Sequence, residues 1–189
     1  WVAPEDRGTY TSGELPFDLD ERNADEQRIQ IDAALAKDEA GATVAHIHAR
    51  TDDGAPSFDT AVFRRIRDSV RGRCPIILNF STGSLDQETA LQENYIREVR
   101  PEIAALNMGS MNYAKYSEKR KAFVFDLIFP NPFSKISALL KAMQDSGVKP
   151  ELECFDTGHT HSIEPLLDMG LLKQPIQFSF IMGVLGGIP

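Results

Sequence analysis

The sequence predicts an α/β fold in which a parallel β-sheet is covered by α-helices. Strand and helix patterns alternate five times along the chain. The expected strands are mostly continuous apolar runs, which is typical of parallel strands buried on both faces. Polar side chains collect where these strands end, and α/β proteins build their sites at the carboxyl ends of parallel strands. These observations fit either an α/β barrel or an open, doubly wound sheet.

The first half of the chain is expected to contribute three helices and three strands. Residues 1–24 are polar and rich in turn formers, so they are interpreted as an arm or loop that precedes a domain at 25–189. Gly41 is expected to end the first helix, and Asp59 to cap the second by accepting a hydrogen bond from a free backbone N–H. The expected elements are helices at 25–40, 59–70 and 86–99, and strands at 43–50, 75–83 and 103–110.

The second half is less regular. Residues 113–132 are hard to assign, and the apolar run at 123–129 fits either a short strand or an aromatic loop. Gly147 and Gly170 each follow a helical pattern and are expected to end it. The remaining elements are helices at 132–146 and 162–169, and strands at 151–156 and 176–183.

Composition excludes several classes of partner. The formal net charge of −8 argues against nucleic acid or an anionic membrane surface as the main partner, although local arginines can still bind a small anion. No apolar run approaches the roughly 20 residues of a membrane span. The chain has two cysteines, Cys74 and Cys154, without metal or redox spacing, so a reduced cytoplasmic protein is expected.

The run at 44–50 carries the strongest chemical signal. His46, His48 and Arg50 occupy alternate positions and therefore share one face of a strand. Two imidazoles about 7 Å apart along a strand can reach one divalent metal ion. The arginine beside them could hold an anionic substrate. Alternatively, both are core histidines whose ring nitrogens are hydrogen-bonded within the protein.

Other strand ends carry further polar groups. Glu151 and Glu153 share the inward face of their strand by the same alternation. The complete set of strand-end residues includes Asn79, Ser81, Thr82, Asn107, Ser110, Asn112, Asp156, His159 and His161.

Taken together, these stretches resemble the β-keto acid cleavage enzyme family, which includes 3-keto-5-aminohexanoate cleavage enzyme. They occur in the family's order and cover about residues 25–189. The matching stretches are 40–50 with Asp53 and Gly54, 77–83, 106–112, 149–158, 170–172 and 182–187.

The resemblance implies a (β/α)8 barrel of the TIM type, with a zinc ion bound by His46 and His48. It also implies a Claisen-type exchange in which a β-keto acid and acetyl-CoA give acetoacetate and a new acyl-CoA. The family's third zinc ligand is a glutamate in an Arg-x-Gly-Leu-Glu-Asp stretch that this sequence does not contain. Residues 1–24 do not match the family's first strand. We therefore expect an incomplete barrel of about five or six units, truncated at both ends and nearly inactive alone.

Within that reaction the residues receive distinct expected roles. Zinc would act as a Lewis acid on the keto oxygen. Ser81 and Thr82 would offer hydroxyl and backbone donors, and Glu153 would bind a substrate amine, position water or shape the metal site. The alternative for Glu153 is an ion pair with Arg50. Substrate contacts are expected from Arg50, Asn107, Ser110, Asn112 and Glu151; His159 and His161 are interpreted as loop histidines that could instead touch metal or substrate.

Two competing interpretations remain. An amidohydrolase-like zinc hydrolase also places His-x-His at the end of a barrel strand, and His159 and His161 could imitate its later histidines. Alternatively, the chain is a non-catalytic barrel fragment that self-associates. Open sheet edges promote association, so a homo-oligomer is expected in every case, with small molecules rather than nucleic acid or membrane as ligands.

Overall fold

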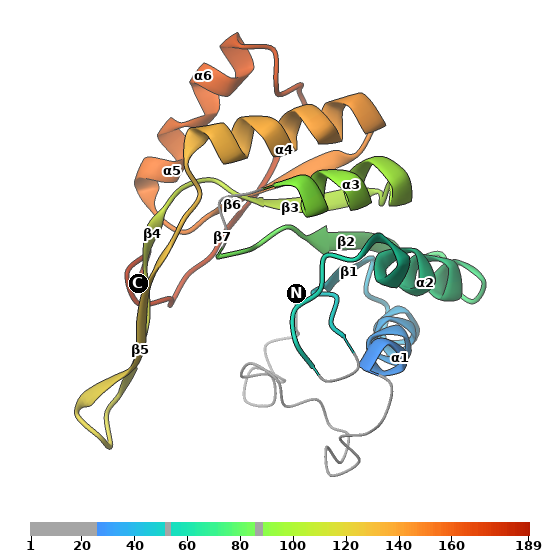
Figure 1. Cartoon of the computed structure of the whole chain (residues 1–189), viewed down its shortest axis with the longest axis horizontal. Helices are drawn as coiled ribbons and strands as arrows, with labels where there is room; N and C mark the ends of the chain where they lie inside the picture. The colour runs from blue at the N-terminus through green and yellow to red at the C-terminus, as the bar shows by residue number, and fades with distance from the viewer. Residues whose placement is uncertain (1–25, 52–53, 86–88) are drawn as a thin grey trace.

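The architecture is a single parallel sheet with helices packed on one face (Figure 1). The computed structural model describes residues 26–51, 54–85 and 89–189. Five strands lie in the order β1-β2-β3-β6-β7, and every pairing among them is parallel. Their bounds are β1 Val44–Ile47, β2 Ile77–Ser81, β3 Ile103–Asn107, β6 Lys149–Cys154 and β7 Gln177–Phe180. This arrangement confirms the expected partial barrel of βα units.

Helices alternate with the parallel strands along the chain. They are α1 Glu26–Glu39, α2 Thr60–Arg71, α3 Ala90–Val99, α4 Phe133–Ser146, α5 Thr157–His161 and α6 Ile163–Asp168. Asp59 caps α2 as expected, because its Oδ1 accepts a hydrogen bond from the Ala61 N–H at 2.8 Å. Gly147 ends α4 with a φ of 70°, the left-handed conformation that glycine adopts readily. The single helix expected at 162–169 is preceded by the short α5.

The hydrophobic core lies between the sheet and the helices. Alternate residues of each central strand point toward the helices, and a stacked aromatic cluster fills the space beneath α2 and α3. Phe63 and Tyr95 stack with ring centroids 4.0 Å apart, and Phe80 lies 4.9 Å from Phe63. All three side chains are at most 1% exposed. The Tyr95 hydroxyl donates to the Ser81 carbonyl at 2.9 Å, so this cluster also anchors the end of β2.

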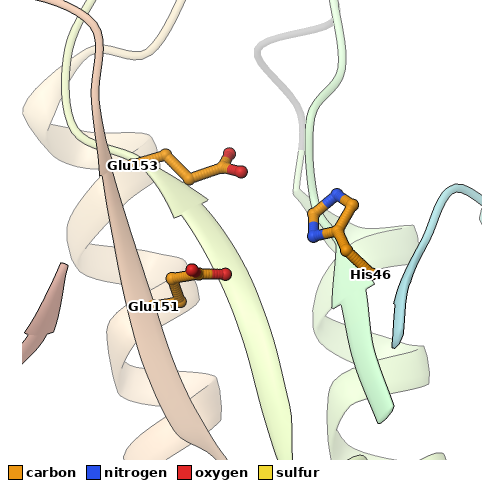
Figure 2. Close-up of side chains that lie close together, drawn as sticks. All are labelled: His46, Glu151 and Glu153. Carbon is orange, nitrogen blue, oxygen red and sulfur yellow. The ribbon is translucent and has the colours of Figure 1, made fainter. Parts of the chain in front are cut away.

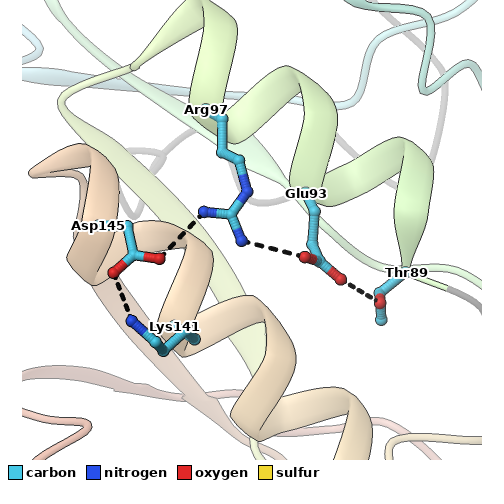
Figure 3. A network of polar contacts seen from close by, with 5 residues as sticks. All are labelled: Thr89, Glu93, Arg97, Lys141 and Asp145. Carbon is cyan, nitrogen blue, oxygen red and sulfur yellow. Dashed lines mark hydrogen bonds and ion pairs between the residues drawn. The ribbon is translucent and has the colours of Figure 1, made fainter.

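A polar network on the surface links α3 to α4 (Figure 3). Arg97 bridges the two helices, because its Nη2 lies 3.2 Å from Glu93 Oε2 and its Nη1 lies 3.2 Å from Asp145 Oδ2. Thr89 and Lys141 extend the network through bonds of 2.6 Å to Glu93 and Asp145, respectively. Both carboxylates are partly exposed to solvent, so these ion pairs contribute little to stability.

The hard-to-assign region is an antiparallel hairpin that projects from the sheet (Figure 1). It consists of β4 Met111–Ser117 and β5 Ala122–Phe129. The run at 123–129 is therefore a strand rather than a loop, and β4 is a strand that the sequence did not predict. At the hairpin base, Phe129 packs edge-on against Phe155, with ring centroids 6.3 Å apart.

Several expected features lie partly or wholly outside the described residues. They are the predicted arm at 1–24, residue 25 of the expected first helix, Asp53 of the family-like stretches, and residues 86–88 of the expected third helix. Within the described part of the chain, none of the helices is long and apolar enough to cross a bilayer.

Candidate active site at the carboxyl ends of the strands

The expected histidine face is present on β1 and its continuation. His46 and His48 lie on the side of the sheet opposite the helices, and the residues that alternate with them are buried in the core. The two Nε2 atoms are 3.0 Å apart. The strand itself is shorter than expected and ends at Ile47. His48 and Arg50 therefore lie in the loop that follows, although the alternation continues.

The two carboxylates of β6 face the same side. Ser179 Oγ donates to Glu151 Oε1 at 2.6 Å, and Asn79 Nδ2 donates to Glu151 Oε2. Glu153 lies two residues further along the strand, in register with Asn107 of β3. The Asn79 side-chain oxygen is buried and has no hydrogen-bond partner among the described residues. Such an oxygen is costly unless another group satisfies it.

Curvature of the sheet brings one histidine and both carboxylates together (Figure 2). His46, Glu151 and Glu153 each place one ligand atom within 4.8 Å of the others. Ala105 lies between the two groups, paired with Ser81 on one side and Glu151 on the other. Its methyl side chain leaves the space above the sheet open, so the imidazole and the carboxylates can face each other.

The surroundings shift the protonation equilibria of the site. Burial, together with the neighbouring His48, lowers the pKa of His46 to about 4. Desolvation and the positive charge of Arg50 also lower the pKa of His48. Both imidazoles are therefore neutral near pH 7, with lone pairs available. Burial and the charge of Glu151 raise the pKa of Glu153 to about 7, so that carboxyl can give or take a proton near neutral pH.

The donor set fits a zinc ion. Neutral imidazole and carboxylate oxygen are both normal zinc ligands. Two nitrogens bound tetrahedrally at about 2.0–2.1 Å from zinc would be about 3.3 Å apart, close to the 3.0 Å that separates the two Nε2 atoms. Glu151 and Glu153 are near enough to His46 to supply a carboxylate.

A small cavity adjoins His48. It has a volume of about 90 Å³, and its lining includes His48, Arg50, Phe63, Ser81 and Gly83. Arg50 does not form an ion pair with Glu153 within the described part of the chain; its Nη1 donates to the Gly54 carbonyl at 2.7 Å instead. The guanidinium keeps further N–H donors for an anion.

The other predicted hydroxyl and amide residues lie in different surroundings. The Thr82 hydroxyl is buried and donates to the Ala105 carbonyl at 2.5 Å, so its hydrogen is used within the sheet. Ser110 is exposed, and its Oγ accepts the Asn131 N–H at 2.8 Å. Asn112 is exposed on the hairpin. Asn107 is buried at the end of β3, close to Gly83. The structure thus brings Asn107 next to the carboxylates and gives Thr82 a structural bond.

The two later histidines do not join the site. His159 is 7% exposed and accepts a hydrogen bond from the Phe155 N–H, whereas His161 is exposed. Two residues contact Glu151 directly: Asn79, a strand-end residue to which the sequence analysis gave no role, and Ser179, which it did not consider. Alternation along β2 and β7 was the available signal, because Asn79 shares the face of Ser81 and Ser179 pairs with Glu153.

Glu153 should make the stability of the metal-free protein depend on pH. The pKa of Glu153 in the folded protein, about 7, lies above the ordinary 4.5. Its stabilising contribution to the free energy of unfolding is therefore complete below pH 4.5 and is lost as pH rises through 7. A pKa shift from 4.5 to about 7 corresponds to about 3 kcal/mol, so at pH 8 Glu153→Gln should be more stable than wild type by about that amount, and most of this advantage should be lost at pH 5. Urea unfolding with a chelator present measures the difference.

The matched control for this comparison is Glu164→Gln, because Glu164 is exposed on α6. It should keep the wild-type pH dependence. His46 acts in the opposite direction, since its lowered pKa costs stability as pH falls from 6.5 toward 4. That contribution is common to all three proteins. Parallel pH profiles for wild type and Glu153→Gln would contradict the prediction.

A parallel α/β sheet with imidazoles and carboxylates grouped at its carboxyl ends is the arrangement of an α/β enzyme. The chain belongs to the β-keto acid cleavage enzyme family, whose sequence profile matches residues 26–189. This match confirms the resemblance drawn from the short sequence stretches.

Curated relatives have related names. A 3,5-dioxohexanoate:acetyl-CoA acetone transferase of Paraburkholderia graminis is 35% identical over 83% of this chain and 56% of that protein. A 3-keto-5-aminohexanoate cleavage enzyme of Fusobacterium nucleatum is 34% identical over 77% and 50%, respectively. A 3-oxoadipate:acetyl-CoA acetyltransferase of Cupriavidus necator is 28% identical over 85% and 52%. The chain spans about half the length of these relatives.

Solved structures support the fold. The apo structure of ObcA and its binary complex with oxaloacetate each match with a TM-score of 0.67 and 20% sequence identity. The match covers 84% of this chain and 36% or 37% of the ObcA chain. At this identity the likeness concerns the fold alone.

Proposed function

We propose that this chain carries the substrate- and metal-binding part of an enzyme that exchanges a β-keto acid with acetyl-CoA, giving acetoacetate and a new acyl-CoA. The observation that carries the proposal is the meeting of His46 with Glu151 and Glu153 beside His48, at the carboxyl ends of a family-typical sheet. The names of the relatives, which pair keto acids with acetyl-CoA, support the same reaction class.

Each group has a role that follows from its chemistry. His46 and His48 would hold zinc, with a carboxylate of β6 nearby; zinc, when bound, supplies Lewis acidity toward the keto oxygen. Arg50 would bind the substrate carboxylate at the cavity adjoining His48. Glu153, with its pKa of about 7, would move a proton at the substrate. Ser81 and Asn107 would supply hydrogen bonds that orient the bound keto acid.

The test is acetoacetate formation from a panel of β-keto acids, measured with and without acetyl-CoA and with zinc present. Activity that requires both co-substrates supports the proposal. Zinc-dependent hydrolysis of amides or esters without acetyl-CoA would instead favour the hydrolase alternative.

Both described cysteines are free, in keeping with our proposal of a cytoplasmic location.

We further propose that the protein is a homo-oligomer. Within the described sheet, β1 and β7 are unpaired edges, and large apolar side chains are exposed nearby. Phe123 and Ile128 on the hairpin are 59% and 70% exposed, and Phe178 and Phe180 on β7 are 48% and 53% exposed. Burying a further 1,000 Å² or so contributes about 25 kcal/mol of gross hydrophobic free energy, before the costs of association.

Light scattering at micromolar concentration should therefore give at least a dimer. Replacing both Phe123 and Ile128 by serine should shift the protein toward monomer, because they are the most exposed large apolar side chains on the hairpin. Leu91→Ser is the matched control, since Leu91 is 59% exposed on α3, away from the hairpin. A monomer mass for the wild-type chain would contradict the proposal.

A further inference from the structure

Strands β3 and β6 separate just beyond the candidate site. Their last backbone hydrogen bond joins the Met108 N–H to the Glu153 carbonyl at 3.0 Å. The bonds of a parallel ladder are evenly spaced, so the next one would take the Phe155 N–H to the Met108 carbonyl. The Phe155 N–H instead donates to His159 Nδ1 at 3.2 Å. The imidazole nitrogen has therefore taken the place of the Met108 carbonyl as the acceptor of this interstrand hydrogen bond.

The other side of this imidazole contacts the chain that leaves β3. The Ser110 backbone lies close enough to the ring to affect its pKa. The ring also lies directly against Gly109, where an added Cβ would be only 2.4 Å from Cδ2 and 2.5 Å from Nε2. Glycine is thus required at 109 for the ring to fit. Asn131 completes the corner, with its N–H on Ser110 Oγ at 2.8 Å and its Nδ2 on the Gly109 carbonyl at 3.3 Å.

These contacts require one state of the ring. Because Nδ1 accepts an amide hydrogen bond, the single proton of the neutral imidazole must lie on Nε2. The Nε2–H can then donate a hydrogen bond to the Ser110 carbonyl. Burial of the ring, which is 7% exposed, favours the same neutral form.

We propose that His159 is a positioning residue that bridges the ends of β3 and β6 and so holds Asn107 beside Glu153. Those two residues form the register pair immediately before the strands separate. The proposed function enters this inference only in the choice of ligand, a keto acid that Asn107 and Glu153 would contact. The bridge itself is a property of the fold, and both parts can be measured separately.

The first experiment concerns the bridge. Long-range ¹H–¹⁵N spectra of the wild-type protein at pH 7 should show His159 protonated on Nε2 and unprotonated on Nδ1. His159→Ala should increase amide hydrogen exchange at Gly109, Ser110 and Phe155 by at least tenfold. His159→Asn should restore protection at Phe155 because its side-chain oxygen can accept that N–H. The Nδ1–H tautomer, or unchanged exchange in His159→Ala, would overturn the proposal.

The second experiment concerns the site. With zinc present, His159→Ala should bind acetoacetate at least tenfold more weakly than wild type, with zinc content unchanged. His161→Ala is the control, since His161 is exposed at the end of α5, the same helix that carries His159. Equal acetoacetate affinity in wild type and His159→Ala would overturn the positioning role. If wild type itself binds no acetoacetate, the proposed function fails, and the exchange rates alone decide whether the bridge exists.

Discussion

Zinc binding is expected to be lost when His46 and His48 are both replaced by alanine. Their Nε2 atoms lie 3.0 Å apart, and both imidazoles are neutral near pH 7 because their pKa values are lowered. Replacing groups that only orient a metal ligand already weakens binding by about 10–100-fold, so removing two ligands should cost at least about 100-fold. Elemental analysis after zinc loading and desalting measures the retained metal.

The carboxylates should contribute in a graded way. Glu151→Gln and Glu153→Gln each remove one charge near His46 and should weaken zinc binding less than the double histidine variant. His161→Ala should retain wild-type zinc because that ring is exposed outside the cluster. Equal zinc content in wild type and the double histidine variant would show that the metal, if any, is held elsewhere.

The acetyl-CoA-dependent acetoacetate formation of the chain, which we expect to be low, should fall by a further factor of about 10²–10⁴ in Glu153→Gln, the usual effect of removing a positioned acid or base. Glutamine preserves the size of the side chain but cannot exchange a proton. The wild-type pH–rate profile should contain an inflection near pH 7, where Glu153 titrates. That inflection should be missing from the residual activity of the variant.

Initial rates between pH 5.5 and 9 decide the matter. Glu164→Gln, the exposed control on α6, should match wild type in both rate and profile. A Glu153→Gln enzyme that keeps full activity would mean that the raised pKa of Glu153 reflects only its burial beside Glu151. The proton transfer would then belong to another residue.

Alternation along single strands was the part of the site that the sequence could predict. A two-residue repeat places His46 with His48, and Glu151 with Glu153, whatever the strands pack against. The meeting of these pairs could not be predicted in the same way. It depends on how the sheet curves across β2 and β3 and on the small side chain of Ala105 between them.

The hairpin was predicted only in part, because the run at 123–129 fits either a strand or a loop and β4 was not predicted. Large apolar residues stand on both faces of β5, so no clean alternation marks the strand. Hydroxyl groups posed a further difficulty. Ser81 and Thr82 are adjacent in the sequence and look equivalent, yet Thr82 donates to the Ala105 carbonyl while Ser81 lines the cavity. Which hydroxyl faces a ligand depends on backbone partners from another strand.

Phe63 belongs to two regions at once, and this couples the evolution of substrate range to folding. The ring stacks on Tyr95 within the core, and it also lines the cavity next to His48. Tyr95 in turn bonds to the Ser81 carbonyl. A smaller residue at 63 would enlarge the cavity for bulkier keto acids but remove core contacts worth about 3–5 kcal/mol. Variants that broaden specificity at this position therefore need a stabilising change elsewhere, so new substrates are easier to reach from a more stable ancestor.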